Sequence, residues 1–201
     1  MTLILIALLG YLIGSVPFAL VIGKVFYNKD IRYYGSKNLG GSNAGRVLGK
    51  KAGLAVMVMD LLKVTFVVFL AAQLIGTETA MVCGGLGAAI GHCYPLFANF
   101  RGGKAVANLY GFLFGLVVFA SYSPLLFFLP LAVFLIVLYG TKIVSLSSIC
   151  SSIVVAVYAF LACDSMVVTA ALVIFALMIL VRHRKNLERI AKHEENKISW
   201  M

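Results

Sequence analysis

Seven long apolar runs, most of them separated by connections of only a few residues, dominate this 201-residue sequence. They cover approximately residues 2–23, 53–75, 80–98, 105–121, 125–140, 146–163 and 165–181. A helix needs about 20 apolar residues to cross a bilayer, so each run is a candidate membrane span. Because 62% of the residues are apolar and 12% are charged, little of the chain remains for a separate aqueous domain. We therefore predict one all-α, polytopic integral membrane domain over residues 1–201, with seven transmembrane helices.

The basic residues are segregated among the connections. Every Lys and Arg except Lys63 falls in the first, third or fifth connection or in the C-terminal tail, whereas the intervening connections carry Glu78 and Asp164 and no basic residue. Cytoplasmic loops of membrane proteins collect Lys and Arg, so this pattern predicts an external N-terminus and a cytoplasmic C-terminus. The net charge of +10 then reflects membrane topology, and we expect no nucleic-acid partner. The first run has no basic segment before it and no small-residue cleavage site, so we expect it to be retained as a span.

A polar stretch with phosphate-binding character occupies residues 35–46, with the sequence GSKNLGGSNAGR. Glycines allow the backbone to turn and to present N–H groups inward, and a concave set of such groups suits a phosphate. Arg46 can bind an oxyanion through two hydrogen bonds. The stretch does not match the G-x-x-x-x-G-K-[ST] nucleotide-binding loop, and a flexible polar loop is the alternative interpretation. Its candidate binding residues are Ser36, Asn38, Gly40, Gly41, Ser42, Asn43 and Arg46.

A second polar stretch, residues 91–104, ends in Gly102-Gly103-Lys104. The glycine pair lets the chain reverse, which places Lys104 near the start of the next helix. A helix N-terminus and an ammonium group together attract an anion. The alternative for the lysine is an ordinary basic anchor after a glycine turn, and the alternative for His92 is a packed, hydrogen-bonded histidine.

A third polar stretch, residues 182–189, begins the basic tail. His183, Asn186 and Arg189 follow one another at intervals of three, so on a helix they share one face that could donate hydrogen bonds to a phosphate. A basic helix end that extends toward the membrane surface is the alternative. Ser145 and the serines after it either line a cytoplasmic pocket or satisfy backbone groups at a helix start.

Charged side chains inside the second apolar run form a fourth feature. Asp60 and Lys63 are spaced to meet on one helix face, and charges within a span are usually paired or functional. We favour a structural ion pair, with positioning of the adjacent polar loop as the alternative. The sequence contains no metal-ligand cluster and no Ser–His–Asp arrangement, so we expect no metal and no cofactor. The polar stretches suit two phosphate-bearing substrates and offer no evident protein nucleophile.

These motifs occur in the order that is typical of a known family. They are Gly14-Ser15 with Pro17, Asp30-Ile31-Arg32, the block from Gly35 to Arg46, Asp60-Leu61-Leu62-Lys63, Gly91-His92 with Pro95 and Phe97, Gly102-Gly103-Lys104-Ala105-Val106-Ala107, and His183-Arg184-x-Asn186. Over nearly its whole length the chain resembles the bacterial acyl-phosphate:glycerol-3-phosphate acyltransferases, the PlsY-type integral membrane enzymes. It departs from the family pattern at Lys37 and Val64, where glycine is usual, and at Asn108, where threonine is usual.

The resemblance implies a seven-helix membrane fold with a cytoplasmic active site, in the bacterial cytoplasmic (inner) membrane. The implied reaction transfers an acyl group from acyl phosphate to the sn-1 hydroxyl of glycerol 3-phosphate. It gives lysophosphatidate and phosphate, the first step of phospholipid synthesis, without a cofactor and without an acyl-CoA or acyl-carrier-protein donor. A functional link to a soluble enzyme that produces acyl phosphate is also implied.

On this resemblance, we assign residue roles as hypotheses. The catalytic residues are Ser36, Arg46, Lys104, His183 and Asn186. The substrate-binding residues are Asn38, Gly40, Gly41, Ser42, Asn43, His92, Gly102, Gly103 and Ser145. We expect direct attack with the donor's own phosphate as proton acceptor and no covalent acyl-enzyme, whereas His92 or His183 as general base is the competing mechanism. An organic-phosphate transporter is the alternative function, although transporter sites lie near the membrane midplane.

Overall fold

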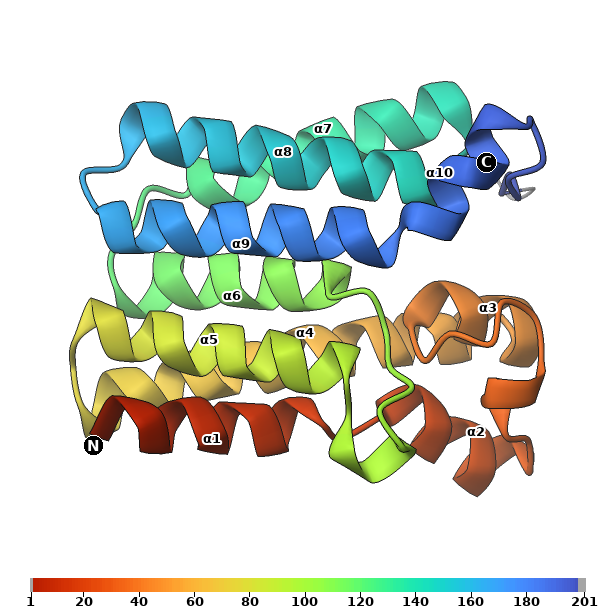
Figure 1. The fold of residues 1–201 in the computed structure, drawn as a ribbon, viewed down its shortest axis with the longest axis horizontal. Coiled ribbons are helices and arrows are strands. Elements are labelled where there is room, and N and C mark those ends of the chain that lie inside the picture. Colours follow the sequence, from red (N-terminus) through yellow and green to blue (C-terminus); the bar gives the residue numbers. More distant parts are fainter. Residues whose placement is uncertain (1, 199–201) are drawn as a thin grey trace. The chain divides into compact units, whose positions relative to one another are not determined.

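The computed structural model describes residues 2–198, and within that range the chain forms ten α-helices, two short 3₁₀ helices and no β-strand. The all-helical prediction is therefore confirmed. The helices belong to two compact units, Met1–Ala120 and Ser121–Met201 (Figure 1). The expectation of a single domain stays a prediction.

The first unit contains six α-helices and both 3₁₀ helices. Their bounds are α1 (Thr2–Gly14), α2 (Phe18–Tyr27), η1 (Ile31–Tyr33), α3 (Gly41–Leu48), α4 (Lys50–Leu74), α5 (Glu78–Cys93), η2 (Leu96–Ala98) and α6 (Val106–Phe119). α1 lies lengthwise against α5, and α4 packs against α1, α5 and α6 (Figure 1). The short helix α3 packs against the start of α4, so the first polar stretch is held by the longest helix of the unit.

Glycines allow α1 and α5 to pack with their backbones in contact. A Cβ atom at Gly10 would overlap the backbone of Gly84, and a Cβ atom at Gly87 would overlap the backbone of Ala7. Lipid is as apolar as a leucine side chain, so membrane helices associate through such close contacts of small residues rather than through the hydrophobic effect. This packing holds the end of α5, which carries His92.

The first apolar run, expected as one helix over residues 2–23, forms two helices with a break at residues 15–17. Pro17 lacks a backbone N–H, and its ring clashes with the preceding helical turn, so a helix cannot continue through it unbent. The carbonyl oxygen of Val16, at the break, accepts a hydrogen bond of 3.1 Å from Lys63 Nζ on α4. The helix break is therefore stabilised by a charged side chain from another helix.

The second unit contains four α-helices. They are α7 (Leu125–Thr141), α8 (Val144–Ala162), α9 (Met166–Arg182) and α10 (Arg184–Ala191). α8 packs against both α7 and α9. On α8, Ser147 Oγ donates to the carbonyl of Ile143 at 2.9 Å and Ser148 Oγ donates to that of Val144 at 2.8 Å. These serines therefore satisfy backbone groups at the helix start, which was one of the two interpretations.

Four helical segments are long and apolar enough to cross a membrane: Thr2–Tyr27, Lys50–Leu74, Glu78–Ala98 and Val144–Ala162. A fifth is added if α9 and α10, which bend by 57° at their junction, count as one span. α6 has 14 residues and α7 has 17, and at about 1.5 Å per residue both are shorter than a hydrocarbon core of about 30 Å. The described chain is thus an all-α, multi-pass membrane protein, and seven crossings stay a prediction.

Candidate functional site

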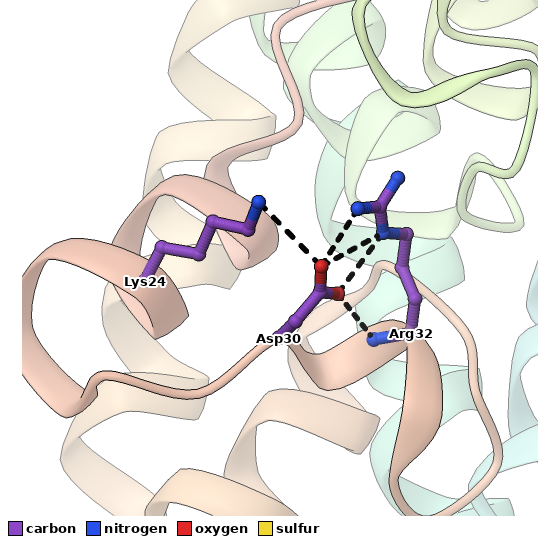
Figure 2. A network of polar contacts seen from close by, with 3 residues as sticks. All are labelled: Lys24, Asp30 and Arg32. Carbon is purple, nitrogen blue, oxygen red and sulfur yellow. Dashed lines mark hydrogen bonds and ion pairs between the residues drawn. The ribbon is translucent and has the colours of Figure 1, made fainter.

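A cluster of charged side chains anchors the connection that carries the first polar stretch (Figure 2). Asp30 accepts hydrogen bonds from Arg32 Nη2 at 2.7 Å, Arg32 Nε at 3.0 Å and the Arg32 backbone N–H at 3.1 Å. Lys24 Nζ lies 3.6 Å from the same carboxylate. The hydrogen bonds from the Arg32 side chain are the main reason that the pKa of Asp30 falls from 3.8 to about 2. The carboxylate therefore stays ionised and ties the end of α2 to η1.

Asn43 holds the first polar stretch in shape from within. Its Oδ1 accepts a hydrogen bond of 2.9 Å from the backbone N–H of Ser36, and its Nδ2 donates to the carbonyls of Asn38 at 3.0 Å and Tyr34 at 3.2 Å. The side chain is buried, at 2% exposure. The geometry thus gives Asn43 a structural role in the loop, while its direct contact with substrate stays a prediction.

The remaining candidates of this stretch lie around the start of α3. Gly40 precedes the helix in extended conformation, and Gly41 packs so closely on α4 that a Cβ atom there would overlap the Met57 side chain. Ser36, Ser42 and Arg46 are exposed. Three of the predicted binding side chains are therefore solvent-accessible, on a loop whose backbone is held by buried contacts.

Two of the three departures from the family pattern have structural consequences. Lys37 adopts φ of 59°, in the left-handed region that favours glycine, which explains why glycine is usual there. Asn108 is fully buried, and neither polar atom of its amide has a hydrogen-bond partner in the part of the chain that the structure describes. Nothing in the structure explains Val64 in place of glycine.

The second polar stretch folds back onto the end of α5. The backbone N–H of Gly103 donates a hydrogen bond of 3.0 Å to the carbonyl of His92. Gly102, Gly103 and His92 are buried, and Lys104 is half-buried just before α6. Ala105, between Lys104 and the helix, adopts φ of 59°. The turn that presents Lys104 is therefore tight, and it is built directly against the histidine.

A charged pair from α4 contacts the histidine on which this turn is built. Lys63 Nζ lies 2.7 Å from Asp60 Oδ1 and 3.1 Å from His92 Nδ1, and the same Asp60 oxygen lies 3.5 Å from that nitrogen. All three side chains are at most 5% exposed. The ion pair expected within α4 is confirmed, and the structure adds His92 to it.

In the second unit, the carboxylate of Glu195 binds Ser145 and two residues of the third stretch, Asn186 and Arg189. One of its oxygens, Oε1, accepts hydrogen bonds from Asn186 Nδ2 at 2.6 Å and Ser145 Oγ at 3.0 Å, and Oε2 accepts one from Arg189 Nε at 2.7 Å. Burial by itself would raise the pKa of the Glu195 carboxyl, but the hydrogen bonds from Arg189, Asn186 and Ser145 outweigh it and hold that pKa below its usual 4.5. Glu195 was not identified as a candidate residue from the sequence. Its one signal there is that it is an acidic residue in a mainly basic tail.

His183 lies at the bend between α9 and α10 and is buried, at 3% exposure. Its Nδ1 lies 2.8 Å from the carbonyl oxygen of Ile179. A carbonyl can only accept, so the ring carries a proton on Nδ1. His183 is held in a fixed orientation in the same small element as Asn186.

The structure thus brings some of the candidates together in separate small groups within each unit. In the first unit, Asn43 bonds to Asn38, and His92 contacts Gly102 and Gly103. In the second unit, Ser145 and Asn186 share one carboxylate. Among residues 2–198, no group of three or more His, Cys, Asp or Glu side chains is placed to hold a metal ion.

Comparison with known proteins decides the family. The family model described as glycerol-3-phosphate acyltransferase matches residues 4–193. The chain belongs to the glycerol-3-phosphate acyltransferase family. Its relatives include the glycerol-3-phosphate acyltransferase of Geobacillus kaustophilus, 45% identical with 98% of this chain and 96% of the relative covered. The enzyme of the same name from Listeria monocytogenes serovar 1/2a is 47% identical, with 99% and 98% covered.

Solved structures of PlsY, an integral membrane glycerol 3-phosphate acyltransferase, have the same fold as this chain. The glycerol 3-phosphate form is matched with a TM-score of 0.90 at 31% identity, covering 99% of this chain and 96% of PlsY. The lysophosphatidic acid form is matched with a TM-score of 0.87 at 30% identity. The resemblance drawn from the sequence motifs to the PlsY-type family is therefore confirmed.

Proposed function

We propose that this member of the glycerol-3-phosphate acyltransferase family transfers an acyl group from acyl phosphate to the sn-1 hydroxyl of glycerol 3-phosphate. The observation that carries the proposal is the match, with a TM-score of 0.90, to PlsY in its glycerol 3-phosphate form. The three polar stretches support it, because they offer basic and amide side chains suited to two phosphate groups. The same family membership favours acyl transfer over the transport of an organic phosphate.

The reaction needs little covalent chemistry from the protein. The glycerol hydroxyl oxygen attacks the acyl carbonyl carbon, the bond between that carbon and the phosphate oxygen breaks, and phosphate leaves. Because the substrate hydroxyl attacks the acyl carbonyl directly, no acyl-enzyme forms, and the hydroxyl proton passes to the departing phosphate. An acyl phosphate is a mixed anhydride with a good leaving group, so positioning and charge stabilisation supply most of the rate enhancement.

The residue roles follow the three stretches. The acyl-phosphate phosphoryl group binds the first stretch, at Asn38, Gly40, Gly41, Ser42 and Asn43, with Ser36 close to the reacting atoms. For the glycerol phosphate, the candidate ligands are Arg46 and Lys104 in the first unit and, separately, Ser145, His183 and Asn186 in the second. The acyl chain lies between helices and enters from the bilayer. Seven crossings of the bacterial inner membrane place these loops at the cytoplasmic face, where a soluble enzyme supplies the acyl phosphate.

The assay that tests the proposal offers glycerol 3-phosphate and three donors in parallel to purified, detergent-solubilised protein. The donors are acyl phosphate, acyl-CoA and acyl-carrier protein, and lysophosphatidate and phosphate are followed together. We expect equal amounts of both products from acyl phosphate alone. Lys104→Ala should lower kcat/KM by about a hundredfold or more, as loss of a charged transition-state contact does, whereas Lys51→Ala, an exposed lysine at the start of α4, should not.

Two outcomes would contradict the proposal. Folded protein that forms no product from any donor would overturn acyl transfer, and uptake of labelled glycerol phosphate into liposomes would then favour transport. Product from acyl-CoA or acyl-carrier protein would overturn the donor assignment. His92→Gln and His183→Gln, made separately, distinguish the two mechanisms. A loss of several powers of ten in kcat with binding retained in either variant would make that histidine the base.

A further inference from the structure

Asp60 and Lys63 form a buried ion pair whose stability alone does not account for its presence. Their side chains are 2% and 3% exposed, and Lys63 Nζ lies 2.7 Å from Asp60 Oδ1. Removing two charges from water costs several kcal/mol per ion, so a buried pair often contributes no more stability than apolar side chains of the same volume. An ionisable residue inside a span is by default a candidate for a functional role.

Lys63 connects three separate parts of the first unit. Its ammonium group, which contacts Asp60, also donates a hydrogen bond of 3.1 Å to the carbonyl of Val16, at the break between α1 and α2. The same nitrogen lies 3.1 Å from His92 Nδ1 at the end of α5. The ammonium thus uses its three N–H donors on one carboxylate, one carbonyl and one imidazole nitrogen. Its position is determined by three elements at once.

The lysine also determines the tautomer of His92. An ammonium group has donors and no acceptor, so the Nδ1 atom that faces it accepts, and the ring proton of the neutral imidazole lies on Nε2. Asp60 supplies a compensating negative charge 2.7 Å from the ammonium group of Lys63. The pair therefore orients the Nε2 edge of the ring.

That edge faces the glycine turn. A Cβ atom at Gly103 would overlap the Nε2 and Cε1 atoms of His92, and a Cβ atom at Gly102 would overlap the carbonyl oxygen of His92. The backbone N–H of Gly103 donates to that same carbonyl at 3.0 Å. Lys104 is the next residue, so its backbone position depends on where the imidazole lies.

We propose that Asp60 and Lys63 are positioning residues for substrate phosphate: through His92 they fix the Gly102-Gly103 turn and so place Lys104. This inference rests on the proposed function, in which Lys104 binds the phosphate of glycerol 3-phosphate. His92 then acts as a buried strut between α4 and the turn, and its ring is oriented by the ion pair.

The test compares single and paired substitutions in the full-length, detergent-solubilised protein. Asp60→Asn and Lys63→Met each leave an unpaired group, and we expect each to raise the KM for glycerol 3-phosphate at least tenfold, with a smaller change in kcat. The double variant Asp60→Asn/Lys63→Met removes both charges at nearly constant volume. We expect it to recover most of the melting temperature lost in the single variants while its KM stays at least tenfold raised.

Thr65→Val is the matched control. Thr65 is buried on the same helix, and its Oγ1 donates a hydrogen bond of 2.9 Å to the carbonyl of Gly111 on α6, away from the glycine turn. We expect this variant to lower the melting temperature without changing the KM for glycerol 3-phosphate. A double variant whose KM returns to the wild-type value together with its stability would overturn the positioning role and leave a structural ion pair.

A binding measurement separates this inference from the proposed function. Isothermal titration with inorganic phosphate reports on the turn whether or not the wild-type protein forms lysophosphatidate. We expect the phosphate Kd to rise at least tenfold in the double variant and to be unchanged in Thr65→Val. An unchanged Kd in the double variant overturns the inference, whereas a wild-type protein that binds phosphate and forms no product overturns the proposed function alone.

Discussion

At the scale of single residues, carboxylates define the conformation of segments that carry basic side chains. Asp30 binds three N–H groups of Arg32 and lies 3.6 Å from Lys24 Nζ. Hydrogen bonds to a charged group are about twice as strong as those between neutral groups. The Asp30 carboxylate thus holds two mutually repelling cations, Lys24 and Arg32, close together and fixes the start of the loop that follows.

We expect Asp30→Asn to lower the free energy of unfolding by about 1–2 kcal/mol at neutral pH, because the charge-assisted hydrogen bonds to Arg32 are weakened. The pKa of Asp30 is 3.8 without these contacts and about 2 in the folded protein. Its stabilisation is therefore complete above about pH 4 and is lost as the pH falls toward 2. Denaturant unfolding in detergent at several pH values between 6 and 2 measures the free energy of unfolding of wild type and Asp30→Asn.

In the same experiment, the difference in stability between wild type and Asp30→Asn should shrink as the pH falls from 4 to 2. Lys29→Gln is the control, because this neighbouring lysine is exposed, whereas the ion pairs of Asp30 are with Lys24 and Arg32. A difference that stays constant over the whole pH range would show that the ionised carboxylate does not anchor the loop.

At the scale of elements, the tail after α10 is fastened to two helices by one side chain. Glu195 bonds Ser145 at the start of α8 and both Asn186 and Arg189 on α10. The backbone N–H of Ile198 also donates a hydrogen bond of 2.9 Å to the carbonyl of Lys142, at the end of α7. A short helix of 8 residues has little stability of its own, so these contacts hold α10 in place.

Glu195→Gln should therefore loosen α10 and the tail. We expect faster amide hydrogen exchange in residues 184–198, by about tenfold or more, since loss of a hydrogen-bonded charge costs about 1.5–3 kcal/mol. Hydrogen exchange read by mass spectrometry measures the change. Glu194→Gln, at the exposed neighbouring position, should leave the exchange as in wild type. Equal exchange in both variants would contradict the anchoring role of Glu195.

At the scale of the whole molecule, the distribution of charge predicts how the chain crosses the bilayer. Basic residues occupy alternate connections, and Glu78 and Asp164 lie in two of the others. Positively charged loops stay on the cytoplasmic side during insertion. This pattern is consistent with seven crossings only if the short helices α6 and α7 both cross, which they can do where the bilayer thins around them.

Labelling of single cysteines tests this topology. In a variant without Cys83, Cys93, Cys150 and Cys163, one cysteine is introduced at Thr79, Asp164, Lys37 or Lys197. We expect a membrane-impermeant maleimide to label Thr79→Cys and Asp164→Cys in intact cells, and the other two only after permeabilisation. Labelling of Asp164→Cys and Lys197→Cys from the same side would contradict seven crossings with a cytoplasmic C-terminus.

Much of this protein follows from local sequence. Six of the seven apolar runs each predicted one helix to within about five residues, whereas the first run is broken at Pro17 and α3 lies outside the runs. Partition into a bilayer and helix formation both depend on stretches of consecutive residues. The pairing of Asp60 with Lys63 followed from their spacing on one helix turn. The family followed from motifs in a fixed order, which need no knowledge of contacts.

Contacts between distant parts of the chain were decided only by tertiary structure. His92 joins Lys63 across 29 positions of sequence, and Glu195 meets Ser145 across 50. The backbone contact of α1 with α5 likewise depends on which glycines face each other. The apolar stretches in the sequence predict which segments become helices, and the positions of Lys and Arg predict on which side of the membrane each loop lies. Which buried polar groups find partners depends on how the helices pack, because only packing brings groups from distant parts of the chain within hydrogen-bond distance. His92 gains a partner in this way, whereas the buried amide of Asn108 has none among the described residues.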